Sequence, residues 1–219
     1  MELQPPFSDA GAPFASGNTM VEGERTGDLA PAWRESADVE GADQLRDGQE
    51  VRVRRMTAED RERIAEFLSR LTDASLSVRF FTPLPRSTAL ATLMEEIDSP
   101  LCLALLLLVR HDGDEQVIAH AEYVRDGPTA RAAEVAFLVT DAFQGHGCAT
   151  VLLHHLAVAG RRAGIREFHG SVLMENDRML EVFRGCGYPL EEWWGPDAVQ
   201  LTLSIDKPPG TDAPSVAPQ

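Results

Sequence analysis

One strand–turn–helix segment constrains the fold of this chain more than any other part of it. Its strand ends in the apolar stretch 135–139, its turn contains Gly145 and Gly147, and its amphipathic helix is expected over 147–163. The first turn of such a helix leaves backbone N–H groups unpaired at the positive end of the helix dipole. Glycine lacks a Cβ, so the backbone can approach a ligand closely. The segment therefore predicts an anion site, usually for a phosphate, over 145–150.

Two familiar phosphate loops do not match this segment. The chain has no G-x-x-x-x-G-K-[ST] motif, and the Gly-x-Gly lacks the third glycine and the downstream acidic residue of a dinucleotide site. A Gly-x-Gly between a strand and a helix can also be only a tight turn. The spacing that does match is Gln-x-x-Gly-x-Ala, formed by Gln144, Gly147 and Ala149.

Charge and apolar content are unevenly distributed over the 219 residues. Residues 1–50 hold eleven acidic residues against three arginines, a net charge of −8 out of −15 for the whole chain. This stretch has few large apolar side chains and no periodicity, so we expect it to be a disordered, acidic extension. We expect the Pro-rich tail 207–219 to be disordered as well. One folded domain is predicted over 51–206.

Composition also indicates the compartment and excludes several partners. The start of the chain lacks a basic region followed by an apolar run, so no secretory signal is expected. The longest apolar run, 101–109, is too short to cross a bilayer. The acidic balance argues against a nucleic-acid partner. The cysteines are unclustered and lack metal-ligand spacing, which suits a reducing cytoplasm and predicts no metal. They are Cys102, Cys148 and Cys186.

The pattern of apolar residues and turns predicts the order β-α-α-β-β-β-α-β-α-β. This order is typical of an α/β (α+β) fold with a mostly antiparallel sheet, flanking helices and one parallel crossover. The sheet must splay where the parallel strand leaves its neighbour, and that gap suits an extended ligand. Strands are expected over 51–56, 101–109, 116–125, 132–139, 168–173 and 198–205, and helices over 57–71, 85–97, 147–163 and 176–186.

This element order, the loop 144–149 and the segment 175–188 resemble the GNAT family of acyl-CoA-dependent N-acyltransferases over essentially the whole of 51–205. The resemblance implies a GNAT fold that is splayed at an acetyl-CoA site. Within the family, the chain is similar to bacterial protein-lysine acetyltransferases that modify acyl-CoA synthetases, without a fused regulatory domain. The motifs that carry this similarity are Ser-Val-Arg-Phe-Phe at 77–81, Ala-Glu-Val-Ala at 133–136, the glycine loop, and Glu-Asn-x-x-Met-Leu at 175–180.

The resemblance implies how acetyl-CoA would bind. Its pyrophosphate would lie on residues 145–150, and its pantetheine arm would pair with the backbone of Leu138 and Val139 as an added strand does. Asn176 would contact the pantetheine or the cleft, although capping its own helix is an alternative role. The N–H of Leu138 or Val139 could stabilise the oxyanion. The predicted cofactor-binding residues are Leu138, Val139, Gln144, Gly145, His146, Gly147, Cys148, Ala149, Thr150, Asn176, Met179 and Phe183.

Three positions in this region depart from the family pattern or invite a second interpretation. His146 stands where an arginine is often found, so the phosphate contact is expected to depend on backbone amides. Phe183 stands where many GNAT enzymes have a tyrosine that protonates the leaving thiolate, and it has no proton to give. Cys148 has no paired base nearby and is expected to fill space rather than act as a nucleophile.

Acyl transfer to an amine needs a base, because a lysine amine has a pKa of about 10.4 and must lose a proton before it attacks. Glu134 is the catalytic candidate, since it interrupts an apolar strand four residues before Leu138, and the resemblance implies the same residue. Alternatively, Glu134 only faces solvent. His120 and Glu122 on the neighbouring strand are weaker candidates, expected on opposite faces of that strand.

Three functions remain open at this stage. The leading one is acetylation of a lysine side chain of a protein, such as an acyl-CoA synthetase, by direct transfer from acetyl-CoA. The second is N-acetylation of a small amine with the same cosubstrate and base. The third is a non-catalytic acyl-CoA sensor. Membrane partners are not expected for any of them.

Overall fold

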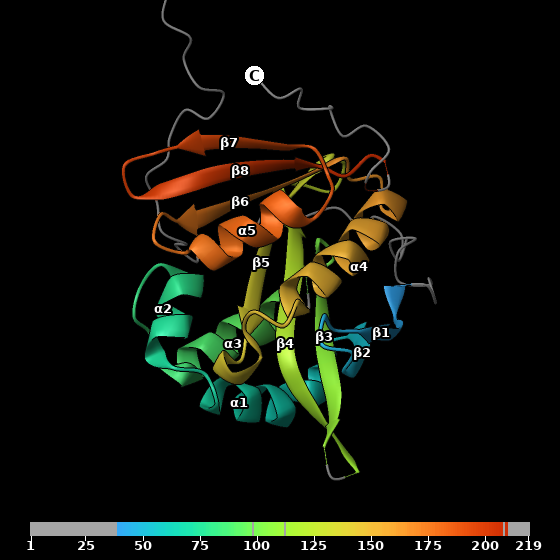
Figure 1. Ribbon diagram of the computed structural model, residues 1–219, viewed down its shortest axis with the longest axis vertical. Helices are drawn as coiled ribbons and strands as arrows, with labels where there is room; N and C mark the ends of the chain where they lie inside the picture. Colours follow the sequence, from blue (N-terminus) through green and yellow to red (C-terminus); the bar gives the residue numbers. More distant parts are fainter. Residues whose placement is uncertain (1–38, 98, 112, 208, 210–219) are drawn as a thin grey trace, which may run out of the picture.

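Eight strands of the chain form one sheet with helices on both faces, in the order β1-β2-β3-β4-β5-β6-β8-β7 (Figure 1). The computed structural model describes residues 39–97, 99–111, 113–207 and 209. The strands are β1 (Gly41–Gln44), β2 (Glu50–Arg55), β3 (Cys102–His111), β4 (Asp114–Arg125), β5 (Ala132–Val139), β6 (Glu167–Leu173), β7 (Leu190–Trp194) and β8 (Ala198–Ser204). The helices are α1 (Arg61–Ser69), α2 (Asp73–Phe80), α3 (Arg86–Glu96), α4 (Cys148–Arg162) and α5 (Asp177–Gly185).

The predicted splay lies between β5 and β6. All neighbouring strands pair antiparallel except these two, which pair in parallel. Their register covers only Ala132–Glu134 of β5 against Glu167–His169 of β6. Beyond Glu134, β5 continues to Val139 while β6 turns away from it, as Figure 1 shows. The α/β class, the single parallel crossover and the splay are therefore confirmed.

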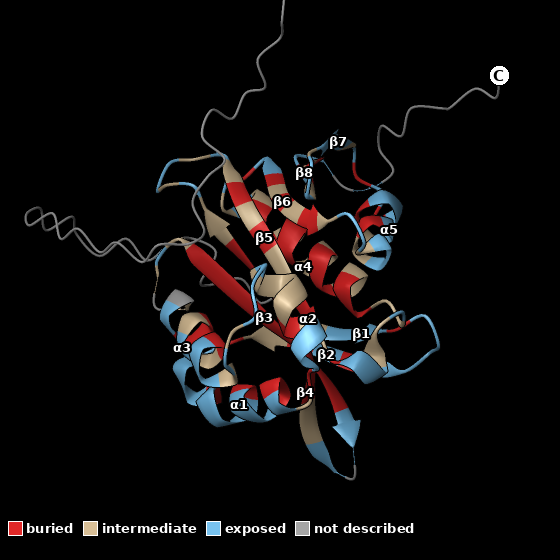
Figure 2. Cartoon of the chain, turned by 90° about the vertical axis from the view of Figure 1, so that its left-hand side faces the viewer, coloured by how far each residue is buried: buried red, intermediate tan, exposed pale blue. Residues whose placement is uncertain are grey.

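The sheet separates two apolar cores. Alternate residues of β3, such as Leu105 and Leu107, pack with α4 and α5. The residues between them, such as Leu106 and Leu108, pack with α1, α2 and α3 on the opposite face. Both sets are buried, which explains why β3 reads as a continuous apolar run rather than an alternating one. Figure 2 shows this burial along β3. None of the described helices combines the length and apolar character needed to cross a bilayer.

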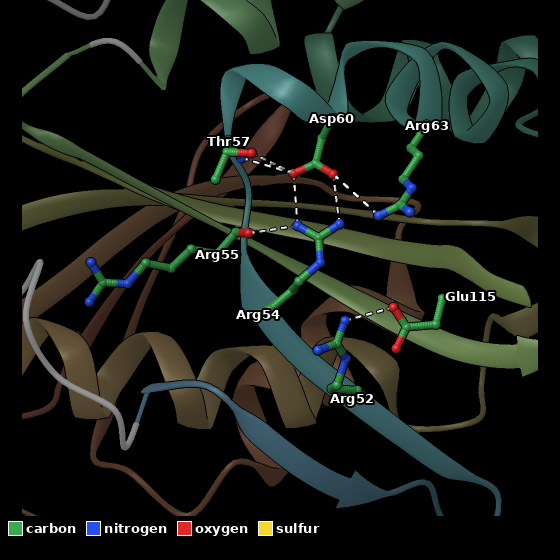
Figure 3. A network of polar contacts seen from close by, with 7 residues as sticks. All are labelled: Arg52, Arg54, Arg55, Thr57, Asp60, Arg63 and Glu115. Atoms are coloured by element: carbon green, nitrogen blue, oxygen red, sulfur yellow. Dashed lines mark hydrogen bonds and ion pairs between the residues drawn. The ribbon is translucent and has the colours of Figure 1, made fainter.

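The start of α1 is joined to β2 by a polar network (Figure 3). Arg54 donates through both terminal nitrogens to Asp60, at 2.7 and 2.6 Å, and the backbone N–H of Thr57 donates to the same carboxylate at 3.0 Å. Thr57 caps the 3-10 turn Ala58–Asp60 that precedes α1. Burial opposes ionisation of Asp60, but the bonds from Arg54 and Thr57 outweigh it and hold the pKa of Asp60 below its usual value.

The N-terminal boundary of the domain lies earlier than predicted. β1 pairs with β2, with Gly41 opposite Val53, and the side chains of Val39 and Leu45 are buried in the core. The expectation of disorder is therefore wrong for residues 39–50. The rest of that prediction, residues 1–38, and nearly all of the tail from Lys207 lie outside the described residues.

Two further elements were not predicted. Helix α2 is short and buries only Leu76 completely, so its apolar signal is weak. Strand β7 lies at the edge of the sheet and exposes Trp193 and Trp194, so it lacks the alternation of a half-buried strand. Both elements depend on contacts with distant parts of the chain.

Candidate active site

The Gly loop (residues 144–150) connects the end of β5 to α4 through the 3-10 turn Asp141–Phe143. Gly145 has φ 83° and Gly147 has φ 94°, which are left-handed conformations that side chains with a Cβ rarely adopt. Gly147 is the N-cap of α4. The local geometry thus favours glycine at both positions.

Several polar atoms of the Gly loop have no partner among the described residues. The side-chain Oγ1 of Thr150 is buried and makes no hydrogen bond there. A buried hydroxyl normally has a partner, and N–H groups at a helix start favour an anion. The loop therefore fits a ligand with several anionic oxygens, such as a diphosphate. The backbone N–H groups without an acceptor in the described part of the chain are those of Gly145, Gly147, Cys148, Ala149 and Thr150.

In the Gly loop, the side chain of Gln144 bonds to other elements and that of Cys148 is buried. Gln144 Nε2 donates to Ser75 Oγ of α2 at 3.1 Å and to the carbonyl of Val139 at 3.4 Å. Its Oε1 accepts from Arg178 of α5 at 3.0 Å. Burial raises the pKa of the Cys148 thiol to about 11, so this thiol stays protonated at neutral pH. Direct cofactor contacts of these two side chains remain predictions.

Helix α5 carries the other predicted cofactor residues. The Oδ1 of Asn176 accepts a hydrogen bond from the backbone N–H of Met179 at 3.2 Å, which is the capping role foreseen as its alternative. Phe183 is buried and packs edge-on against Phe137, with ring centroids 6.1 Å apart. Asn176 and Phe183 therefore have structural contacts of their own, and their contact with a ligand remains a prediction.

The backbone of β5 distinguishes the two predicted oxyanion donors. The N–H of Thr140 donates to the carbonyl of Ile118 in β4, at 2.9 Å. Because successive residues of a strand point their backbone groups to alternate sides, the N–H of Val139 points away from β4 and into the splay. The N–H of Leu138 points toward β4, and its side chain is buried against α1–α3. Of the two, only Val139 offers its N–H to the splay.

Glu134 is the half-buried carboxylate at the point where β5 and β6 separate. It forms no hydrogen bond and no ion pair with any other described residue. A carboxylate without a partner in such a position can accept a proton or bind a cationic group. Glu134 therefore has the access that a general base needs.

The expectation that His120 and Glu122 lie on opposite faces is wrong. Residues two apart in a strand share a face, and His120 Nε2 lies 3.7 Å from Glu122 Oε2. The register of β4 and β5 places both on the face that Glu134 occupies. Arg79 of α2 donates to the Glu122 carboxylate in a buried ion pair. Burial also lowers the pKa of His120, which is neutral at pH 7.

These contacts separate the three base candidates. Glu122 is 2% exposed and ion-paired with Arg79, and His120 is 0% exposed, so neither can meet an incoming amine. Glu134 is the member of the group that is accessible. The Arg79–Glu122 pair instead attaches α2 to the sheet. Arg79 lies in the motif 77–81, but its pairing with Glu122 was not predicted from the sequence.

Two neighbours of the site were not foreseen from the sequence. His169 of β6 is the register partner of Glu134, and its Nε2 lies 2.8 Å from the Oδ1 of Asp126. The turn between β1 and β2 reaches the Gly loop, where the Oδ2 of Asp47 lies 2.7 Å from His146 Nδ1. The Asp-Gly pair at 47–48 is a hairpin signal that could have identified this turn.

Comparison with known proteins places this geometry in a family. Residues 70–188 match the acetyltransferase (GNAT) family. An acetyltransferase of Pseudomonas aeruginosa is 31% identical over 69% of this chain and 83% of its own length. The acetyltransferase Pat of Mycolicibacterium smegmatis is 35% identical over 45% of this chain, which spans 28% of that protein.

A solved structure is similar over most of the folded part. The GNAT domain of PAT from S. lividans is 35% identical, with a TM-score of 0.67, and the match covers 77% of this chain and 98% of that domain. The family match, the two acetyltransferase relatives and this shared fold agree with one another. The chain therefore belongs to the GNAT family of acetyltransferases and is an acyltransferase.

Proposed function

We propose that the chain is an acetyl-CoA-dependent N-acetyltransferase that modifies a lysine side chain of a protein, such as an acyl-CoA synthetase. The observation that carries this proposal is the accessible Glu134 carboxylate beside the splay, on the strand that leads into an anion-binding loop. Similarity to the Pat acetyltransferases supports a protein substrate. The three free, buried cysteines suit a cytoplasmic location for the reaction.

The Gly loop and β5 supply the groups that would hold acetyl-CoA. The free N–H groups of Gly145 and of residues 147–150, together with the Oγ1 of Thr150, are suited to its diphosphate. The outward N–H of Val139 is suited to its pantetheine arm or to the oxyanion of the thioester carbonyl. When bound, acetyl-CoA supplies a thioester that is activated toward an amine.

The protein groups then manage the protons and the charge. Glu134 takes a proton from the lysine ammonium, directly or through a water, so that the neutral amine can attack the thioester carbon. The Val139 N–H stabilises the negative charge on the carbonyl oxygen. As the carbon–sulfur bond breaks, the attacking nitrogen gives its second proton to water or to the departing thiolate, and the amide forms. Phe183 cannot protonate the sulfur, so the thiolate leaves as an anion or takes a proton from water.

The competing function is acetylation of a small amine, which uses the same cosubstrate and base. The test supplies the full chain and acetyl-CoA with a purified acyl-CoA synthetase or with a panel of polyamines and aminoglycosides. Free thiol reports turnover, and mass spectrometry locates the acetyl group. Lysine acetylation of the synthetase supports the proposal. Turnover of a small amine without protein acetylation would replace the protein substrate with a small one.

A further inference from the structure

The turn between β1 and β2 is held against the Gly loop by specific contacts. The backbone N–H of Arg46 donates to the carbonyl of His146 at 3.1 Å, and His146 pairs with Asp47. The turn is closed internally by a bond from the N–H of Leu45 to the carbonyl of Gln49, at 2.9 Å. These bonds fix the position of Arg46 relative to the start of α4.

The side chain of Arg46 lies across Gly147. A Cβ added to Gly147 would lie 3.1 Å from the Cγ of Arg46 and 3.5 Å from its Nε. Glycine at this position therefore serves two purposes, because it adopts a positive φ and leaves room for the arginine stem. The stem brings the guanidinium beside the N-terminus of α4.

The charge of Arg46 has no partner among the described residues. The residue is exposed, and its side chain makes no hydrogen bond or ion pair there. The Gly loop has no lysine or arginine of its own, and the Nδ1 of its histidine is engaged by Asp47. The N–H of Gln49 and the ring of His146 lower the pKa of Asp47, so this carboxylate stays ionised and paired with His146.

We propose that Arg46 binds the diphosphate of acetyl-CoA and supplies the cation that the Gly loop lacks. The inference rests on the proposed function, in which the Gly loop holds that diphosphate. A planar guanidinium can donate two parallel hydrogen bonds to phosphate oxygens, and the loop N–H groups donate from the other side. The β1–β2 turn is thereby part of the cofactor site.

The test is calorimetric titration of the full chain with three ligands. Acetyl-CoA and 3′-dephospho-acetyl-CoA share the diphosphate, whereas acetyl-pantetheine has none. Arg46→Gln should weaken binding of the first two by about tenfold each and leave the third unchanged. Arg46→Lys keeps the charge without the planar fork and should bind with intermediate affinity. Arg110→Gln is the matched control, because it removes one exposed charge near the turn between β3 and β4.

The outcomes separate this inference from the function on which it rests. Equal affinity of Arg46→Gln and wild type for acetyl-CoA would overturn the inference and leave the function standing. Weakening that disappears with 3′-dephospho-acetyl-CoA would overturn it too, because Arg46 would then bind the 3′-phosphate. Failure of the wild-type chain to bind acetyl-CoA would remove both. An unchanged unfolding midpoint of Arg46→Gln shows that its loss of affinity is not a loss of fold.

Discussion

Glu134 and Glu122 show how neighbouring carboxylates on one face of a sheet acquire different roles. Glu122 is enclosed beneath α2 and neutralised by Arg79, so it contributes to structure. Glu134 lies where β5 loses its parallel partner, and its carboxylate has no hydrogen bond or ion pair with a described residue. Both side chains are carboxylates with the same chemistry. Glu134 is accessible and Glu122 is not, because the splay leaves Glu134 without a neighbouring strand beyond it. This difference supports Glu134 as the residue that accepts the proton.

We expect Glu134→Gln to bind acetyl-CoA within about twofold of wild type while kcat falls by about 100-fold or more, which is the usual contribution of a general base. The amide keeps the size of the side chain but cannot take a proton at neutral pH. Calorimetry measures the binding, and thiol release measures the rate. Glu191→Gln is the matched control, because it removes an exposed carboxylate from β7. Equal rates for Glu134→Gln and wild type would exclude Glu134 as the base.

The elements divide into those whose sequence carries their own signal and those formed by distant contacts. The strand and helix on either side of the Gly loop were predicted because both have long apolar faces. β1 was missed because Gly-Ala-Asp-Gln has no such pattern, and its pairing partner, β2, must already be in place. The position of Glu134 and the loop followed from local spacing. The Arg79–Glu122 contact spans 43 residues and has no local signal.

This ion pair is one of the contacts that attach α2 to the rest of the fold, and it gives a test of the element. We expect Arg79→Met to lower the free energy of unfolding by about 3 kcal/mol, because it removes the arginine that pairs with the buried Glu122 carboxylate. Adding Glu122→Gln should recover part of that loss, since the buried group is then neutral. Urea unfolding measures both. Arg52→Met breaks an exposed pair with Glu115 and should cost less than about 1 kcal/mol. A similar cost for Arg79→Met and Arg52→Met would contradict this role.

The junction of β2 and α1 gives a test by pH. The pKa of Asp60 is lower in the folded state than in the unfolded chain, where it is about 3.9. The ionised carboxylate therefore stabilises the fold above about pH 3.9, and this stabilisation is lost as the pH falls through the pKa of the folded state. Asp60→Asn should lower the free energy of unfolding by about 2 kcal/mol at pH 7. Below about pH 4 the difference from wild type should shrink. Glu59→Gln, at an exposed site, is the control. A difference that stays constant down to pH 3 would contradict the role of the Asp60 charge.

At the scale of the whole molecule, residues 39–50 join the edge of the sheet to the Gly loop. His155 of α4 contacts the carbonyl of Val39 at 3.0 Å and the carboxylate of Asp43 at 3.2 Å. Further along, Arg46 and Asp47 contact His146 in the Gly loop. The segment 39–50 is therefore fixed at two separate places, to α4 and to the Gly loop. A segment that composition assigned to an acidic extension contributes to both the core and the candidate active site.

Two shortened chains test this role, one starting at Val39 and one starting at Val51. The shorter chain loses β1 and the buried side chains of Val39 and Leu45, each of which contributes about 1.5–3 kcal/mol when fully buried. We therefore expect its free energy of unfolding to be at least about 3 kcal/mol lower than that of the longer chain. Its affinity for acetyl-CoA should also fall, by at least as much as Arg46→Gln reduces it, because Arg46 and the contacts at His146 are both removed. Equal stability and equal affinity of the two chains would show that residues 39–50 are needed neither for the fold nor for binding at the Gly loop.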